Sequence, residues 1–209
     1  MGENADTRIK ICGLRREADV LLMNELLPEY VGFVFAQKSR RYVTPGQAGT
    51  MRGKLDGRIT PVGVFVDAEP QLAAGLLNQG IIEIAQLHGK EDEDYLKQLR
   101  QLTNKPFIKA FRIETREDAA RAAESSAWRI LVDHGAGGTG EAFDWGLLNG
   151  LERPYFLAGG LSAENVGEAI RRLHPFAVDV SSGVEKDGWK DPDKVRAFIQ
   201  TVRRRTDRD

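Results

Sequence analysis

The feature that most constrains the fold is a regular alternation of two patterns along the whole chain. Short runs of apolar and β-branched residues recur, and such runs are typical of parallel strands that are covered on both faces. Segments with helical spacing lie between them. The predicted strands are Ile9–Cys12, Tyr30–Phe35, Pro61–Val66, Glu83–Leu87, Phe107–Phe111, Ile130–Asp133, Tyr155–Ala158 and Ala177–Val180.

The last two predicted helices carry start signals. We expect Ser162 to be the N-cap of one helix, with Glu164 in its first turn. Asp191 followed by Pro192 predicts the N-cap and first position of the other. The helical pattern is weakest near 143–151. The two apolar faces repeat at positions i, i+3, i+4 and i+7, namely Val166, Ala169, Ile170 and Leu173, and then Val195, Phe198, Ile199 and Val202.

Eight strands that alternate with helices are compatible with a doubly wound open sheet or with a barrel. An open sheet often has a glycine fingerprint after its first strand, but here Cys12-Gly13-Leu14 follows that strand. Glycines gather instead after the last strands, at Gly159-Gly160 and Gly183. This distribution predicts an α/β fold of the (β/α)8 TIM-barrel type, with a phosphate site after strands seven and eight.

No linker or low-complexity stretch interrupts the 209 residues. We therefore expect one barrel domain over residues 1–209, with residues 1–7 as a flexible N-terminal extension. No apolar run approaches the ~20 residues that a membrane-spanning helix needs. The polar start lacks the apolar centre of a signal peptide, which favours a cytoplasmic location. The single cysteine, Cys12, fits a reducing compartment because it cannot form an internal disulfide.

The charge balance gives no general attraction to nucleic acid. Lysine and arginine number 30 against 31 aspartates and glutamates, for a formal net charge of −1. The one basic cluster, Arg203-Arg204-Arg205, is compatible with a nucleic-acid patch or with a solvated helix end, and we favour the helix end because cations complement the helix dipole there. We expect no nucleic-acid partner and no membrane partner.

In a barrel of this type, polar residues at the strand C-termini face the active-site mouth. The three histidines have no metal-binding spacing, so we expect no metal. No G-x-S-x-G nucleophile elbow is present either. Acid–base chemistry on a phosphorylated ligand is what these positions favour. They are Lys10, Cys12, Arg41, Asp67, Gln86, His88, Lys109, Arg112, Asp133, Asp179, Ser181 and Ser182.

The glycine-rich turns predict how a phosphate is bound. Glycines let backbone N–H groups approach an anion closely, and a following helix N-terminus adds a favourable dipole. Gly159-Gly160 precedes one predicted helix, and Ser182-Gly183 follows the last strand. Gly138, in a third glycine-rich stretch, is a further candidate. A Gly-Gly pair alone is weak support because tight turns contain such pairs for conformational reasons.

Six motifs follow one another in order from about residue 8 to residue 202. They are KICGL at 10–14, GFVF at 32–35, GVFV at 63–66, QLHG at 86–89, GGTG at 137–140 followed by FDW at 143–145, and VDVSSGVE at 178–185. Together they resemble the phosphoribosylanthranilate isomerase family of tryptophan biosynthesis. Residues 36–37, 141–142 and 186–189 depart from the family's usual loops.

This resemblance implies an aldose–ketose isomerase that performs an Amadori rearrangement without a cofactor. Asp133 matches the family's general acid, and its pKa must be raised because an ordinary aspartic acid, at ~3.9, is ionised at pH 7. Cys12 matches the general base, and we expect Lys10 on the same strand face to favour its thiolate. The alternatives are a structural acceptor for Asp133 and an inert buried thiol for Cys12.

The resemblance also implies a set of binding residues. Arg41 matches the arginine that binds the anthranilate carboxylate, although Arg40 adjoins it. Asp179 matches a residue near the ribose hydroxyls or amine, with a structural role as the alternative. The phosphate ligands are expected at Gly138, Gly159, Gly160, Ser182 and Gly183. The expected partner is a phosphorylated aminosugar, and the chain is expected to be a monomer or a homodimer.

Two other functions are compatible with these residues. The first is a histidine-pathway or dual-specificity aminoaldose isomerase acting on a larger, two-phosphate substrate. Barrels of that group have an aspartate where Cys12 stands and carry two phosphate sites, so Cys12 argues against it. The second is a non-catalytic phosphosugar-binding barrel, against which the joint presence of Cys12, Asp133 and Arg41 argues.

Overall fold

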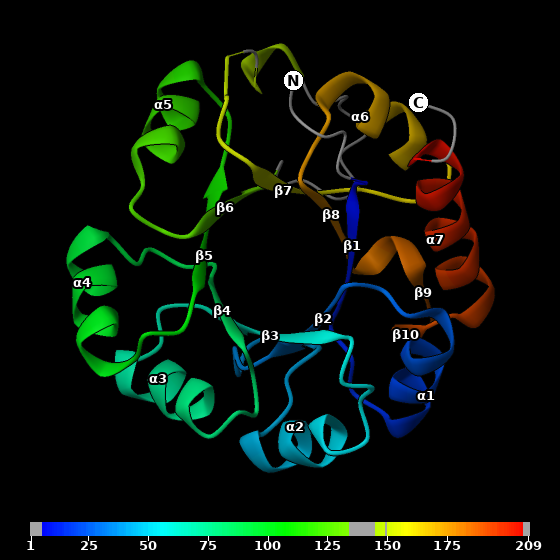
Figure 1. The fold of residues 1–209 in the computed structure, drawn as a ribbon, viewed down its shortest axis with the longest axis horizontal. Helices are drawn as coiled ribbons and strands as arrows, with labels where there is room; N and C mark the ends of the chain where they lie inside the picture. Colours follow the sequence, from blue (N-terminus) through cyan, green and yellow to red (C-terminus); the bar gives the residue numbers. More distant parts are fainter. Residues whose placement is uncertain (1–5, 134–144, 149, 207–209) are drawn as a thin grey trace.

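Eight parallel strands close into a barrel in the computed structural model, which describes residues 6–133, 145–148 and 150–206 (Figure 1). The first strand pairs with the last, so that Lys10 lies opposite Asp179. The TIM barrel predicted from the sequence is confirmed. The strands are β1 (Arg8–Cys12), β2 (Tyr30–Val34), β3 (Thr60–Phe65), β4 (Ile84–Leu87), β5 (Phe107–Arg112), β6 (Arg129–Asp133), β7 (Tyr155–Ala158) and β8 (Ala177–Val180).

Helices surround the barrel on its outside (Figure 1). Between β6 and β7 the described residues contain a short 3-10 helix at Trp145–Leu148. None of the helices in the described ranges is long and apolar enough to cross a membrane. The α-helices are α1 (Glu17–Leu26), α2 (Pro45–Arg52), α3 (Pro70–Asn78), α4 (Glu93–Leu102), α5 (Arg116–Glu124), α6 (Val166–Leu173) and α7 (Pro192–Thr206).

A small hairpin that the sequence analysis did not predict follows β8. A 3-10 turn at Ser182–Val184 leads into β9 (Glu185–Lys186), which pairs antiparallel with β10 (Trp189–Lys190). In Figure 1 this hairpin lies beside α1 and α7. It therefore stands between the end of the last strand and the final helix.

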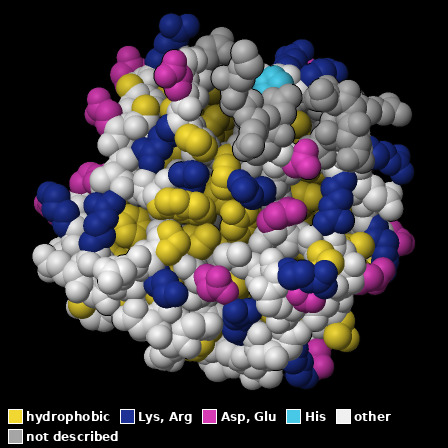
Figure 2. Space-filling view, viewed as in Figure 1, with side chains coloured by type: hydrophobic (Ala, Val, Ile, Leu, Met, Phe, Trp, Pro, Cys, Tyr) yellow, Lys and Arg dark blue, Asp and Glu magenta, His cyan; other side chains and the backbone are white. Residues whose placement is uncertain are grey.

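Two apolar layers follow from the alternation of side chains along each strand. One layer packs between the strands and the helices and includes Val31 and Phe33 of β2. The other fills the barrel interior and includes Tyr30 and Phe156, whose ring centroids are 5.3 Å apart. On the face drawn in Figure 2, hydrophobic side chains gather in the middle, over the ring of strands, and charged side chains surround them.

The predicted start of α7 is confirmed, whereas the predicted start of α6 is wrong. Asp191 Oδ1 accepts from the backbone N–H groups of two residues in the first turn of α7, at 3.1 and 3.0 Å. The N-cap of α6 is Asn165 rather than Ser162. The side chain of Asn165 accepts from the Ser162 N–H and donates to the Gly160 carbonyl, at 2.8 and 2.9 Å. These bonds hold residues 162–165 as a separate turn before the helix.

The end of α7 packs against the end of α1. The Arg203 guanidinium donates to the carbonyl oxygens of Leu26 and Leu27, at 2.9 and 2.8 Å. Cations are favourable at such a helix C-terminus, where carbonyl groups lack partners within the helix. Arg203 therefore has a structural use at this junction, which agrees with the helix-end interpretation of the basic cluster.

Replacing Phe156 by alanine should destabilise the barrel by about 3–5 kcal/mol, because the ring is fully buried and its loss leaves a cavity. Leu102, which is 40% exposed, gives the control: Leu102→Ala should change the free energy of unfolding by less than about 0.5 kcal/mol. Urea denaturation of both variants measures this difference. Equal losses in the two variants would contradict the interior packing described above.

Candidate active site

A cavity of about 410 Å³ opens at the C-terminal ends of the barrel strands. It brings together nearly all the residues that the sequence analysis selected for catalysis and binding. Gly138 lies outside the described residues. Those that line the cavity are Cys12, Arg41, Asp133, Gly159, Gly160, Asp179, Ser182 and Gly183, together with Gln86 and His88.

Cys12 ends β1 as a buried free thiol that is 8% exposed. Burial raises its pKa because the charged thiolate loses hydration. The neighbouring Asp179 carboxylate raises the pKa further. Lys10 and Lys190 lower it, as expected for nearby cations, but they do not offset the burial. Lys10 therefore lowers the pKa of Cys12 as expected, but not enough to favour the thiolate over the thiol.

Lys10 forms a buried ion pair with Asp179. The Lys10 ammonium is fully buried and donates to Asp179 Oδ2 at 2.7 Å. The other carboxylate oxygen, Oδ1, is buried and has no hydrogen-bond partner among the described residues. The amide oxygen of Gln86 is also buried and has no hydrogen-bond partner among the described residues. Buried acceptors in proteins are nearly always paired, so these two cavity-lining oxygens are suited to accept hydrogen bonds from a ligand.

Asp133, at the end of β6, belongs to a hydrogen-bonded chain of side chains. Gln86 Nε2 lies 3.2 Å from His88 Nδ1, and His88 Nε2 lies 3.1 Å from Asp133 Oδ2. Because an amide nitrogen only donates, Nδ1 must accept here and Nε2 must carry the hydrogen. His88 then donates to Asp133 from the cavity wall. The sequence placed Gln86 and His88 at the mouth but gave no indication of this contact.

Arg41 lines the cavity, whereas its neighbour Arg40 does not. Glu185 accepts two hydrogen bonds from Arg41, at 2.7 Å from Nε and 2.8 Å from Nη2. Arg40 reaches the same carboxylate at 3.0 Å, but its side chain is 62% exposed. The geometry thus favours Arg41 over Arg40 as the arginine that faces a ligand.

Glu185 and Lys190 are site-supporting residues that the sequence reasoning missed. Lys190 Nζ donates to Glu185 Oε1 at 2.9 Å. Burial raises the pKa of Glu185, but the hydrogen bonds from Arg41 and Lys190 outweigh it and hold that pKa at about 2. Glu185 ends the VDVSSGVE motif at 178–185, but no periodicity connects it to Arg41, and nothing in the sequence singles out Lys190.

Two loops form the part of the cavity suited to an anion. Gly159 and Gly160 have φ angles of +92° and +64°, in the left-handed region that glycine tolerates best. A Cβ on Gly183 would lie 1.9 Å from the Leu161 carbonyl oxygen, so the two loops approach each other backbone to backbone. Two buried lysines of the barrel strands are engaged elsewhere: Lys10 binds Asp179, and Lys109 donates to Glu91 Oε2 at 2.8 Å.

Comparison with known proteins agrees with this geometry. A family model described as N-(5′-phosphoribosyl)anthranilate (PRA) isomerase matches residues 9–201. The N-(5′-phosphoribosyl)anthranilate isomerase of Thermoanaerobacter sp. (strain X514) is 44% identical over 202 residues, which cover 94% of this chain and 98% of that protein.

Solved structures of the same family superpose closely on this barrel. The phosphoribosyl anthranilate isomerase of Thermotoga maritima matches with a TM-score of 0.86 and 37% identity, over 94% of this chain and 98% of that one. A phosphoribosyl anthranilate isomerase in complex with reduced 1-(o-carboxyphenylamino)-1-deoxyribulose 5-phosphate matches with a TM-score of 0.84 and 36% identity, over the same shares. The chain therefore belongs to the N-(5′-phosphoribosyl)anthranilate isomerase family.

Proposed function

We propose that Cys12 and Asp133 are the base and acid with which this aldose–ketose isomerase of tryptophan biosynthesis rearranges N-(5′-phosphoribosyl)anthranilate. The product is 1-(2-carboxyphenylamino)-1-deoxyribulose 5-phosphate, and the reaction uses no cofactor because the substrate nitrogen is the electron sink. The observation that carries the proposal is that Cys12, Asp133 and Arg41, from three different parts of the barrel, line one cavity beside two glycine-rich loops.

The first step is protonation of the furanose ring oxygen by Asp133. The C1′–O bond breaks, its electron pair stays on the oxygen as a hydroxyl group, and the anthranilate nitrogen forms an iminium. Asp133 must be protonated beforehand, although His88 donates a hydrogen bond to its Oδ2 atom. Bound substrate excludes water and brings its carboxylate into the cavity. Both effects raise the pKa of a carboxyl group, so substrate binding favours the acid form of Asp133.

The second step is removal of the C2′ proton by Cys12. The electron pair of the C–H bond moves to the iminium and gives an enolamine, which tautomerises to the ketone. The raised pKa of Cys12 means that its thiolate, once formed, binds a proton strongly. General bases gain efficiency with rising pKa, at the cost of a smaller ionised fraction near neutral pH.

The remaining cavity residues bind the substrate in this proposal. Arg41 offers a planar guanidinium to the anthranilate carboxylate. Asp179 Oδ1, buried and without a partner among the described residues, accepts from a ribose hydroxyl or the amine. Backbone N–H groups of Gly159, Gly160, Ser182 and Gly183 bind the phosphate, and Gly138, outside the described residues, is proposed to join them.

The location and assembly belong to the same proposal. A reducing compartment preserves a base that works as a free thiol, which supports the cytoplasm as its location. The ligand is a small phosphorylated aminosugar. Monomer and homodimer are both compatible with this site, because one chain supplies every cavity residue named above.

Cys12→Ser and Asp133→Asn should each lower kcat by at least ~100-fold, within the range that general acids and bases contribute. KM should change little because neither residue is a proposed binding anchor. Fluorescence of freshly prepared N-(5′-phosphoribosyl)anthranilate gives both constants, and circular dichroism checks the fold. A variant that keeps near-normal kcat would show that its residue has been given the wrong role.

Gly160→Val should weaken binding of ribose 5-phosphate at least ~10-fold, or ~1.4 kcal/mol. A branched Cβ would occupy the space of the proposed phosphate, and apart from Gly160 and its chain neighbours no atom of the described residues lies within 4 Å of that position. Gly80→Val is the matched control, because Gly80 has a φ of +72° and equally open surroundings but lies outside the cavity. If both variants lose the same affinity, backbone strain explains the effect and the phosphate assignment fails.

A further inference from the structure

The guanidinium of Arg41 is held in place by a residue that does not itself line the cavity. Glu185 binds the Nε and Nη2 edge of Arg41, and the Glu185 side chain is only 5% exposed. Nη1 has no hydrogen-bond partner in the described part of the chain. The Arg41 side chain also passes over the turn after β1, where a Cβ on Gly13 would lie 2.4 Å from Arg41 Cδ. Glu185 therefore fixes which edge of Arg41 remains for a ligand.

Lys190 connects this arrangement to the anion-binding loop. Its ammonium is 1% exposed and donates to Glu185 Oε1 at 2.9 Å and to the Ser181 carbonyl at 3.0 Å. Ser181 directly precedes Ser182-Gly183, and its hydroxyl donates to the Cys12 carbonyl at 3.0 Å. A continuous set of contacts thus runs from Arg41 through Glu185 and Lys190 to the end of β8.

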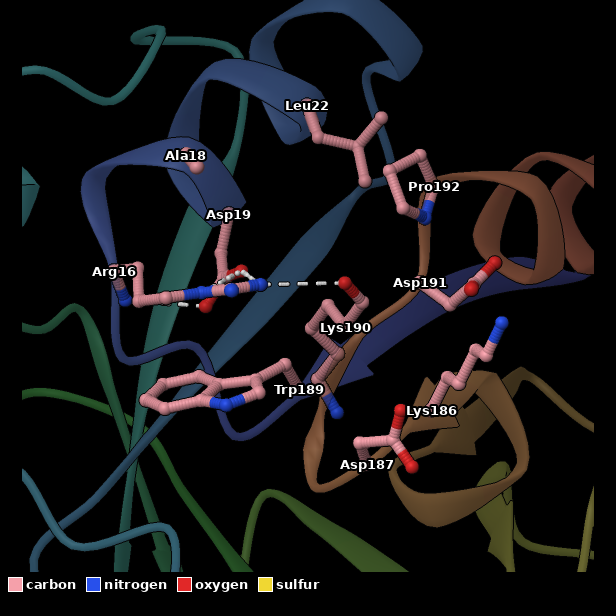
Figure 3. A pocket seen from close by; sticks show the side chains of 10 residues that line it. All are labelled: Arg16, Ala18, Asp19, Leu22, Lys186, Asp187, Trp189, Lys190, Asp191 and Pro192. Carbon is pink, nitrogen blue, oxygen red and sulfur yellow. Dashed lines mark hydrogen bonds and ion pairs between the residues drawn. The ribbon is translucent and has the colours of Figure 1, made fainter.

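The hairpin that carries Glu185 and Lys190 is braced from outside the barrel (Figure 3). Arg16 lies between Asp19 and the backbone of Lys190, with Nη2 at 2.8 Å from Asp19 Oδ1 and 3.3 Å from the Lys190 carbonyl. The guanidinium of Arg16 also stacks on the Trp189 ring at 4.4 Å, and that of Arg15 at 4.0 Å. The hairpin is therefore tied to the start of α1.

We propose that Glu185 and Lys190 are positioning residues that fix the distance between the carboxylate-binding end and the phosphate-binding end of the substrate site. The inference rests on the proposed function, in which Arg41 binds the carboxylate and Ser182-Gly183 the phosphate. Both ends are attached to one braced hairpin, so the site selects a substrate whose two anionic groups match this distance. Without Glu185, the Arg41 side chain would lose conformational entropy each time a substrate binds, and this loss would weaken the affinity.

The test is the steady-state kinetics of four variants with N-(5′-phosphoribosyl)anthranilate, and ribose 5-phosphate as a competitive inhibitor. Glu185→Gln should raise KM by about 10-fold or more while kcat stays within about threefold, because Arg41 is misplaced but the acid and base are not. Arg41→Ala should do the same, and adding Glu185→Gln to it should raise KM no further. Lys190→Met should raise both KM and the inhibition constant of ribose 5-phosphate, because Lys190 also holds the phosphate loop.

Two further variants keep the test decisive. Glu185→Gln leaves Lys190 buried beside an uncharged partner, which can destabilise the fold. Glu185→Asp keeps the negative charge on a side chain that is one methylene group shorter. This variant should therefore fold, and it should raise KM less than Glu185→Gln does. Arg40→Ala is the matched control, since Arg40 contacts the same carboxylate from an exposed position, and its KM should change by less than about twofold.

Each outcome separates this inference from the proposed function. If both Glu185 variants leave KM within about twofold while Arg41→Ala raises it, the positioning role is wrong and the carboxylate assignment of Arg41 stands. If Arg41→Ala leaves KM unchanged, that assignment fails and the inference fails with it. A fall in kcat as large as the rise in KM, or additive effects of the Glu185 and Arg41 changes, would also overturn it.

Discussion

The buried ion pair between Lys10 and Asp179 is the interaction on which both the barrel closure and the active site depend. The two residues face each other where β1 meets β8, and neither is more than slightly exposed. Removing one partner of a buried pair costs about 3–5 kcal/mol because the other charge remains without compensation. The pair also lies next to Cys12 and leaves one Asp179 oxygen available in the cavity. The same contact thus links the two strands whose pairing closes the barrel and places a carboxylate oxygen at the cavity.

Most of the buried charged side chains around the cavity form ion pairs with one another. Lys109 is held by Glu91, and Lys190 by Glu185, with both lysines buried. Arg41, in contrast, keeps Nη1 without a partner among the described residues. In a partly desolvated site such a donor binds a carboxylate more strongly than an exposed arginine does. In the proposed binding mode, the backbone loops at the other end bind the phosphate by geometry rather than by net charge, so the two ends recognise their groups by different physical means.

The sequence predicted the strands and the cavity residues well, for identifiable reasons. Parallel strands covered on both faces leave continuous apolar runs, and their C-terminal ends are local positions that can be read directly, as for Cys12 and Asp133.

The helix start at Ser162 was wrong because the Asn165 side chain closes a separate turn, and competing side-chain contacts of this kind have no periodic signal. The partner of Lys10 lies 169 residues away, and Glu185 meets Arg41 across 144 residues. Such pairs arise only when the barrel closes.

The active site is expected to distinguish a one-phosphate substrate from a two-phosphate substrate. This expectation depends on Cys12 at the end of β1 and on the neighbouring glycine loops after β7 and β8. The most direct measurement compares kcat/KM of the purified protein for freshly generated N-(5′-phosphoribosyl)anthranilate and for the aminoaldose of the histidine pathway. We expect turnover of the first substrate without added metal or nucleotide, and far lower turnover of the second. Comparable kcat/KM values for the two substrates would contradict it.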